Sequence, residues 1–217
     1  MQAATVRHLM RQTLSGLGAA HGANLVHRDI KPSNILLAGL LSESAVESNS
    51  GAKEEAPFLA KIADFGLARV ASSHSRITLP DSVLGTPEYM SPEQARGEED
   101  IDHRTDLYSA GVVLYEMLTG RTPFKADAPS VVIYQILHDD PPDPRVLSGT
   151  VDPKLASLAL RMMAKRPEDR FDSAEEAMAA LDRGRSVFSR ERRRRVTRRS
   201  VDGSRRCQAL HDGPLLK

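Results

Sequence analysis

The chain has 217 residues, 40% of them hydrophobic and 27% charged, which is typical of a soluble globular domain of ordinary size with an extension. The single cysteine, Cys207, excludes an internal disulfide framework and indicates a reducing compartment, so we expect a cytoplasmic protein without a leader or membrane span. The net charge of +1 hides an asymmetry. Residues 185–217 hold eleven Lys and Arg against three Asp and Glu and carry +8, so residues 1–184 carry −7.

The first part of the chain combines one long helical pattern with two short strand patterns. Apolar residues recur at helical spacing over 5–21, and Gly22 and Asn24 favour an end there. Two short apolar runs, 35–37 and 59–62, predict strands that could pair as a hairpin. The intervening stretch is rich in Ser, Glu, Asn and Gly, which predicts a solvated, flexible insertion at about 40–57.

The second part of the chain is predicted to be helical. The segment 106–119 is apolar on most faces and is followed by Gly120, so it predicts a buried helix that ends at this glycine. Further helices are predicted at 128–138, 153–165 and 173–183. Ser173 and Glu176 have the spacing of a capping box at the start of the last one. The predicted fold class is therefore mainly α with a small β-hairpin.

One short polar region contains the residue types that phosphoryl transfer requires. The stretch His27 to Asn34 reads HRDIKPSN, and Asp64-Phe65-Gly66 follows thirty residues after Asn34. Phosphoryl transfer needs an acceptor near the substrate hydroxyl, oxygen ligands for magnesium and a cation near the moving phosphate. Asp29, Lys31, Asn34 and Asp64 are residues of these types. The alternative is that both aspartates are ordinary loop carboxylates that cap turns.

The order and spacing of several motifs resemble the eukaryotic-type serine/threonine protein kinases, and bacterial members of that family in particular. The matching stretches are His-Arg-Asp-x-x-x-x-Asn at 27–34, Asp-Phe-Gly at 64–66, Ser91-Pro92-Glu93 where the family usually has Ala-Pro-Glu, Asp106 to Gly111 with Tyr108 for the commoner Trp, and Lys165 to Arg170. The resemblance covers residues 5–184 and implies the large, helical lobe of a kinase.

The resemblance also implies an activity and a role for each residue of the region. It implies an enzyme that uses ATP and Mg²⁺ to transfer the γ-phosphoryl group to serine or threonine hydroxyls of a protein substrate. Asp29 would accept or orient the proton of the substrate hydroxyl, and Lys31 would contact the transferred phosphate. Asn34 and Asp64 would hold magnesium. Leu36 would form the floor under the adenine.

Substrate choice and regulation are expected to depend on the segment after Asp64. In the family, the lysine at position 31 goes with a threonine of the substrate-docking loop, here Thr86, and this pairing favours serine or threonine as acceptor. Thr78 is the first candidate for an activating phosphorylation and Ser82 the second, because phosphate can order a loop by pairing with arginine. The alternative is that these are solvated loop hydroxyls with no role.

Three further residues are expected to be structural. Arg170 matches the arginine that pairs with the position of Glu93, so a buried ion pair is predicted between them. Asp106 is expected to accept backbone hydrogen bonds from the catalytic loop. His27 is a packing residue in the family, and its imidazole is not expected to act as the base.

The family's smaller, strand-rich lobe has no counterpart in the sequence before His27. That lobe carries a Gly-rich phosphate loop and a lysine–glutamate pair. We therefore expect residues 1–184 to form a large lobe alone. Three alternatives stay open: a partial kinase domain, a chain that receives a small lobe in trans, and a catalytically inactive kinase-like binding module.

The C-terminal region 185–217 is expected to be a basic, disordered tail. Seven of the ten residues 190–199 are arginine, and such a run usually remains solvated and self-repelling. It could bind nucleic acid or an anionic membrane surface by counterion release. A solvated linker is the alternative. A protein whose main function is nucleic-acid binding is disfavoured by the acidic charge of residues 1–184.

Overall fold

The structure is a computed structural model that describes residues 1–39, 58–64 and 87–183. Within these ranges it is mainly helical, with one small sheet. The longer elements are α1 (Ala3–Gly22), β1 (Ile35–Gly39), β2 (Phe58–Ile62), α4 (Arg104–Thr119), α5 (Pro129–His138), α7 (Pro153–Met162) and α8 (Ala174–Arg183). The short elements are α3 (Pro92–Ala95), α6 (Pro144–Leu147) and the 3₁₀ turns η1 (Pro32–Asn34), η2 (Pro87–Tyr89) and η3 (Pro167–Asp169).

Helix α1 forms because its apolar residues recur on one stripe, and these side chains are buried. The helix ends in a Schellman motif: Asn24 takes the left-handed conformation with φ of 57°, its amide donates to the His21 carbonyl, and the Leu25 amide donates to the Ala20 carbonyl. The predicted end at Gly22 is therefore correct. Of the two residues expected to end the helix, Asn24 provides the left-handed turn.

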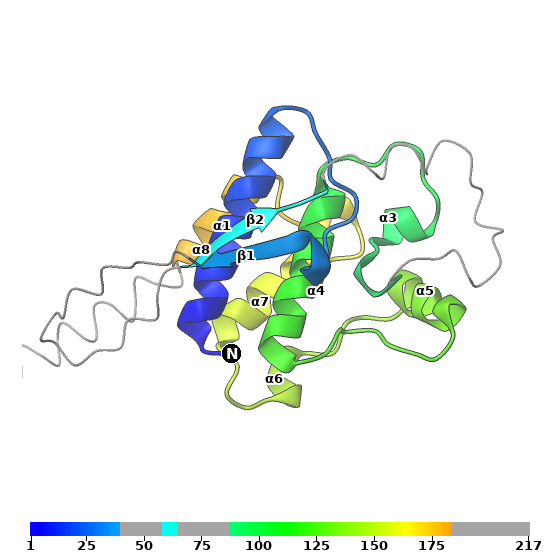
Figure 1. The fold of residues 1–217 in the computed structure, drawn as a ribbon. Coiled ribbons are helices and arrows are strands. Elements are labelled where there is room, and N and C mark those ends of the chain that lie inside the picture. The colour runs from blue at the N-terminus through cyan, green and yellow to red at the C-terminus, as the bar shows by residue number, and fades with distance from the viewer. Residues whose placement is uncertain (40–57, 65–86, 184–217) are drawn as a thin grey trace, which may run out of the picture. The chain divides into compact units, whose positions relative to one another are not determined.

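The predicted hairpin is present. Strands β1 and β2 pair antiparallel, with Ile35 opposite Ile62 and Leu37 opposite Ala60. In Figure 1 the hairpin lies across α1, and β2 contacts that helix. Ile62 packs on Gly16 of α1, where an added Cβ would lie 3.2 Å from the Ile62 side chain. The glycine therefore lets the strand approach the helix closely.

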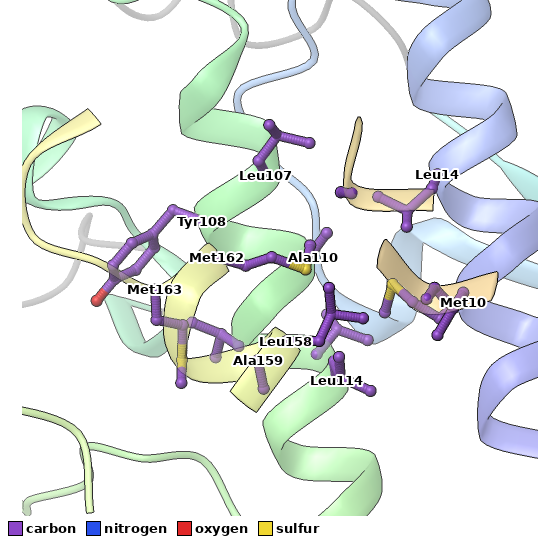
Figure 2. Close-up of a cluster of buried hydrophobic side chains, with 14 of the residues drawn as sticks. Met10, Leu14, Leu107, Tyr108, Ala110, Leu114, Leu158, Ala159, Met162 and Met163 are labelled. Atoms are coloured by element: carbon purple, nitrogen blue, oxygen red, sulfur yellow. The ribbon is translucent and has the colours of Figure 1, made fainter. Parts of the chain in front are cut away.

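The main hydrophobic core lies between α1, α4 and α7, with α8 packed against it. Figure 2 shows the interdigitating side chains of α1, α4 and α7 and of Met163, which follows α7. The predicted buried helix ends as expected, because Gly120 takes φ of 78° after the last turn of α4. The pattern thus located both the buried helix and its end.

The remaining helices agree with prediction except at their ends. Helix α7 ends at Met162, earlier than the expected residue 165. The capping box predicted before α8 is only half present. Ser173 accepts from the Glu176 amide, but the Glu176 carboxylate accepts from the amide of Asp172 rather than that of Ser173. The short helices α3 and α6 were not predicted.

A second, smaller hydrophobic cluster surrounds α5, away from the main core. Its buried members are Ala95, Phe124, Val132 and Ile136. Lys165 lies beside it: its ammonium donates to the carbonyl oxygens of Gln135 and Ile136, at 3.2 and 2.6 Å, and stands 4.5 Å from the centre of the Phe124 ring. A cation thus closes the C-terminal end of α5.

By its internal contacts the chain divides into two units, Met1–Leu181 and Asp182–Lys217. The predicted insertion at 40–57, the segment 65–86 and the basic tail from residue 184 lie outside the described residues. Among the helices that the structure does describe, none combines the length and apolar character needed to span a bilayer.

Candidate active site

The loop that begins at His27 is held by one buried carboxylate. Asp106, in the first turn of α4, accepts from the backbone amides of His27 and Arg28 at 2.8 and 2.7 Å. Arg28 has φ of 65°, an unfavourable conformation for a side chain of this size, which the bonds to Asp106 hold in place. The structural role predicted for Asp106 is thus present in its geometry.

His21 was missed by the sequence analysis. Its Nε2 lies 2.9 Å from the Asp106 carboxylate, and both side chains are buried. Since the carboxylate is acceptor-only when ionised, His21 donates through Nε2 and forms a third bond to Asp106. A histidine at a helix C-terminus has no pattern of its own that would indicate this contact.

The imidazole of His27 links the loop to the strand that leads to Asp64. Its Nδ1 accepts from the Asp29 amide at 3.2 Å, so its Nε2 carries the proton and donates to the Ala63 carbonyl at 2.8 Å. The residue is buried, and both ring nitrogens have backbone partners. His27 therefore links the loop to the strand through its two ring nitrogens.

The structure brings three of the predicted site residues together around one carboxylate. The Asp29 side chain, about half exposed, lies 2.9 Å from the Lys31 ammonium. The Asn34 amide nitrogen donates to the Asp29 carboxylate at 3.0 Å and to the Asp29 backbone carbonyl at 2.7 Å. Lys31 and Asn34 thus fix the direction of the Asp29 carboxylate, while one side of it stays open to solvent.

Asp64 stands next to this group through the backbone. The Ala63 amide donates to the Asn34 carbonyl at 2.9 Å, and Asp64 follows directly with φ of 61° and an exposed side chain. Asn34 uses its amide nitrogen on Asp29, which leaves Oδ1 for other partners, and the structure gives this oxygen one long contact, 3.4 Å from the Ser33 hydroxyl.

These two oxygen donors fit magnesium. Mg²⁺ is usually held by one or two protein oxygen ligands while substrate phosphates and water complete its octahedron. A cluster of three or more acidic, His or Cys side chains of the kind that binds a metal by itself is not found among the described residues. Asn34 and Asp64 contribute two oxygen atoms of the type that Mg²⁺ takes as ligands.

Leu36, the predicted adenine floor, lies on β1 with 54% of its surface exposed. This exposed apolar side chain lies on the strand that directly follows the loop of His27 to Asn34. The predicted docking residue Thr86 and the predicted phosphorylation sites Thr78 and Ser82 lie outside the described residues.

The predicted ion pair between Glu93 and Arg170 is present and buried. Both guanidinium NH groups donate to the Glu93 carboxylate at 2.7 Å. Burial by itself raises the pKa of Glu93, but hydrogen bonds from Arg170 and its charge outweigh burial and leave the pKa lowered. The pair fixes α3 against the end of α7 and the loop that follows.

Helix α3 also contacts the loop of His27 to Asn34 directly, through a residue that the sequence analysis missed. Ser91 and Gln94 form a reciprocal capping box, and the Gln94 amide donates to the Arg28 carbonyl at 2.7 Å. The spacing Ser-x-x-Gln before a helix is a signal that could have predicted the cap. The bond to Arg28 depends on the tertiary fold and has no sequence signal.

Tyr89 links the turn η2 to helix α4. Its hydroxyl donates to Glu116 of α4 at 2.6 Å. Burial, the bond to Glu116 and the negative charges of Glu116 and Glu88 raise the pKa of Tyr89 far above its usual range, so the phenol stays protonated. The bond ties the turn after Pro87 to the buried helix.

Comparison with known proteins assigns this arrangement to a family. The model of the protein kinase domain matches residues 1–181. The chain belongs to the eukaryotic-type serine/threonine protein kinase family. It is 39% identical over 206 residues to the serine/threonine-protein kinase pkn3 of Myxococcus xanthus and 38% identical over 176 residues to the serine/threonine-protein kinase PknB of Mycolicibacterium smegmatis.

These kinases are considerably longer than the chain. The alignment with pkn3 covers 92% of this chain and 34% of that kinase, and the alignment with PknB covers 81% of this chain and 25% of that kinase. The chain thus spans about a third or less of the length of the curated relatives it matches. Its fold, mainly α with a β-hairpin, is that of a kinase domain's helical part.

Proposed function

We propose that this kinase chain provides the large-lobe half of a site that transfers the γ-phosphoryl group of ATP to serine or threonine hydroxyls of a protein. The observation that supports this most directly is the convergence of Lys31 and Asn34 on the Asp29 carboxylate. Catalysis of this transfer depends mainly on positioning and on charge neutralisation. Pre-formed bonds to a half-exposed carboxylate provide both.

In this proposal each side chain has one task. Asp29 accepts or orients the proton of the attacking hydroxyl, and its bonds to Asn34 keep the carboxylate aimed while that happens. Lys31 lies against Asp29 and places its positive charge where the transferred phosphoryl group arrives. The Asn34 and Asp64 oxygens hold Mg²⁺, which when bound would neutralise phosphate charge. Leu36 supports the adenine.

The remaining partners belong to the same proposal. Thr86 selects serine or threonine at the docking loop, and phosphorylation at Thr78 or Ser82 activates the enzyme. A small lobe completes the ATP site, from the same polypeptide or in trans. Residues 1–184 form the large lobe, and the basic tail 185–217 is either a solvated linker or a contact with nucleic acid or an anionic membrane surface. The kinase acts in the cytoplasm, the reducing compartment that its single cysteine indicates.

The first test concerns Asp29. Replacing Asp29 by Asn removes the proton acceptor and keeps the shape, so phosphate transfer from Mg²⁺-ATP to a serine- and threonine-containing protein should fall about 100-fold or more. The measurement is radiolabel transfer followed by phosphoamino-acid analysis, with the chain alone and with the chain joined to a kinase small lobe. Asp127→Asn, which changes an exposed aspartate of the same kind, should keep the wild-type rate.

Two results would contradict the proposal. One is an Asp29→Asn variant as active as the wild type. The other is a wild-type chain that transfers no phosphate even when joined to a small lobe, which would favour the catalytically inactive binding module.

A further inference from the structure

Within the part of the chain that the structure describes, β2 has a neighbouring strand on one edge only, and the side chain of Gln12 occupies its other edge. Strand β1 pairs with one edge of β2, so the backbone groups on the other edge of β2 need partners from elsewhere. Gln12 of α1 provides them: its Oε1 accepts from the Ala60 amide at 2.7 Å and its Nε2 donates to the Phe58 carbonyl at 3.0 Å. The orientation of the amide is settled, because a backbone N–H requires the oxygen.

This pair of bonds copies what a neighbouring strand would do. In a parallel pair, a residue that faces residue j of the neighbouring strand donates to the carbonyl of j−1 and accepts from the amide of j+1. The side-chain amide of Gln12 makes the same two bonds around Leu59: it donates to the Phe58 carbonyl and accepts from the Ala60 amide. His8, one turn earlier on α1, supports the arrangement. Its Nε2 lies 2.6 Å from the Gln12 amide nitrogen, and its ring packs edge-on against Phe58.

The other end of the same strand leads to the catalytic loop. Beyond β2, the Ala63 amide and carbonyl bond to Asn34 and His27, and Asp64 follows. Besides its pairing with β1, strand β2 has contacts near both of its ends. Gln12 fixes it at Phe58 and Ala60, and the catalytic loop fixes it at Ala63. The strand thus carries the Gln12 contacts near its start and leads, one residue past Ala63, to Asp64, so the position of the strand on α1 bears on the place of Asp64 beside Asn34.

We propose that Gln12 is a positioning residue for the phosphate-associated cation: its amide stands in for a third strand on β2 and thereby sets the place of Asp64 beside Asn34. The part that concerns the cation rests on the proposed function. The part that concerns the strand and Asp64 stands on the hydrogen bonds alone. Sequence reasoning does not find this residue, because one glutamine on a helix carries no strand signal.

The test uses the full 217-residue chain and two substitutions at Gln12. Gln12→Met keeps the length and the helix propensity of the side chain and removes both bonds. Gln12→Glu keeps the acceptor for the Ala60 amide and loses the donor to Phe58. The matched control is Ser15→Ala, a change at an exposed position of the same helix. Backbone amide exchange and amide chemical shifts are measured by NMR, and Mn²⁺ is titrated as the probe cation.

In Gln12→Met we expect the Ala60 amide to exchange about 5–10 times faster, the loss that one net hydrogen bond gives. The Ala63 and Asp64 amide signals should shift, and the dissociation constant of Mn²⁺ should rise at least about threefold, since the two oxygen donors are no longer aligned. Gln12→Glu should keep Ala60 exchange slow and give an intermediate Mn²⁺ affinity. Ser15→Ala should match the wild type.

Faster Ala60 exchange with unchanged Asp64 signals and unchanged Mn²⁺ affinity would overturn the proposal, because Gln12 would then stabilise the strand only. A wild-type chain that binds no Mn²⁺ would instead count against the metal role of Asn34 and Asp64. In that case the positioning role is judged on the Asp64 amide: a shift in Gln12→Met upholds it, and an unmoved signal rejects it.

Discussion

Arg170 uses all five of its N–H donors inside the protein. Two bond to Glu93, and the others reach the backbone carbonyls of Ala164, Lys165 and Arg104. The guanidinium also lies 5.0 Å from the centre of the Tyr108 ring. One side chain thus joins α3, the start of α4 and the loop after α7, which are far apart in sequence.

Because every donor is used, a lysine cannot replace this arginine. Arg170→Lys offers three donors and no planar fork, and Arg170→Met leaves the buried Glu93 carboxylate without a positive charge beside it. We expect either change to lower the free energy of unfolding by about 3–5 kcal/mol, measured by urea denaturation. Arg166→Lys is the control, because Arg166 is largely exposed and its ion pair with Glu168 is a surface pair. Similar losses at both positions would contradict this.

Some of these side-chain contacts were predictable from the sequence, and others were not. The pairing of Glu93 with Arg170 and the anchoring by Asp106 were predictable from the resemblance, since both depend on motif positions. The bonds of His21 and Gln94 were not. They are made by polar side chains whose partners lie 85 and 66 residues away, so only the assembled fold reveals them.

Among the elements, α4 and α7 pack unusually close at one glycine. A Cβ on Gly111 would lie 2.7 Å from the Met162 Cβ and 3.0 Å from the Met163 Cγ, the two methionines that Figure 2 shows against α4. The glycine lies inside a helix, where it is otherwise unfavourable. Its presence there is explained by the space that α7 occupies.

Gly111→Ala should therefore destabilise the chain although alanine favours a helix. We expect the clash to lower the free energy of unfolding by about 1–3 kcal/mol after the gain in helix propensity, because both neighbours belong to a packed core. Thermal unfolding followed by circular dichroism measures it. Gly149→Ala is the control, since an added Cβ there meets no atom within 4 Å. A Gly111→Ala variant as stable as the wild type would refute the close packing.

The long elements were predictable because their sequences show a periodic apolar pattern, a glycine at the end of a helix or a short apolar run. Helix α1 shows a regular apolar stripe, α4 is followed by Gly120, and the two strands are short apolar runs. The four-residue helices α3 and α6 are too short to show a period. Each begins with a proline after a capping side chain, Ser91 or Asp143, and this is the signal that could have found them.

For the molecule as a whole, Lys165 connects the small cluster around α5 to the main body of the domain. Partial burial lowers the pKa of its ammonium to about 8, despite the nearby negative charges of Asp139 and Asp140. The folded chain therefore releases this proton at lower pH than the unfolded chain, whose lysine titrates near 10.5. Between these values the unfolded state binds more protons, so stability rises with pH.

We expect Lys165 to contribute a gain of roughly 1 kcal/mol in the free energy of unfolding between pH 8 and pH 10, a figure reduced for its partial exposure. In Lys165→Met this increment should be absent. Denaturation curves at several pH values measure the difference between the two proteins. Lys154→Met, at an exposed lysine, should follow the wild-type pH dependence. Parallel pH curves for Lys165→Met and the wild type would disprove the linkage.

The anchoring by Asp106 of the loop that begins at His27 also determines when that loop can form during synthesis. His27 leaves the ribosome 79 residues ahead of its partner. At about 5–20 residues per second the nascent loop waits roughly 4–16 s for its carboxylate. Until then the bond to Asp106 that holds Arg28 in its left-handed backbone conformation is missing. The half-made chain carries the residues of a phosphotransfer site without their arrangement, so the loop becomes ordered only when α4 has been made.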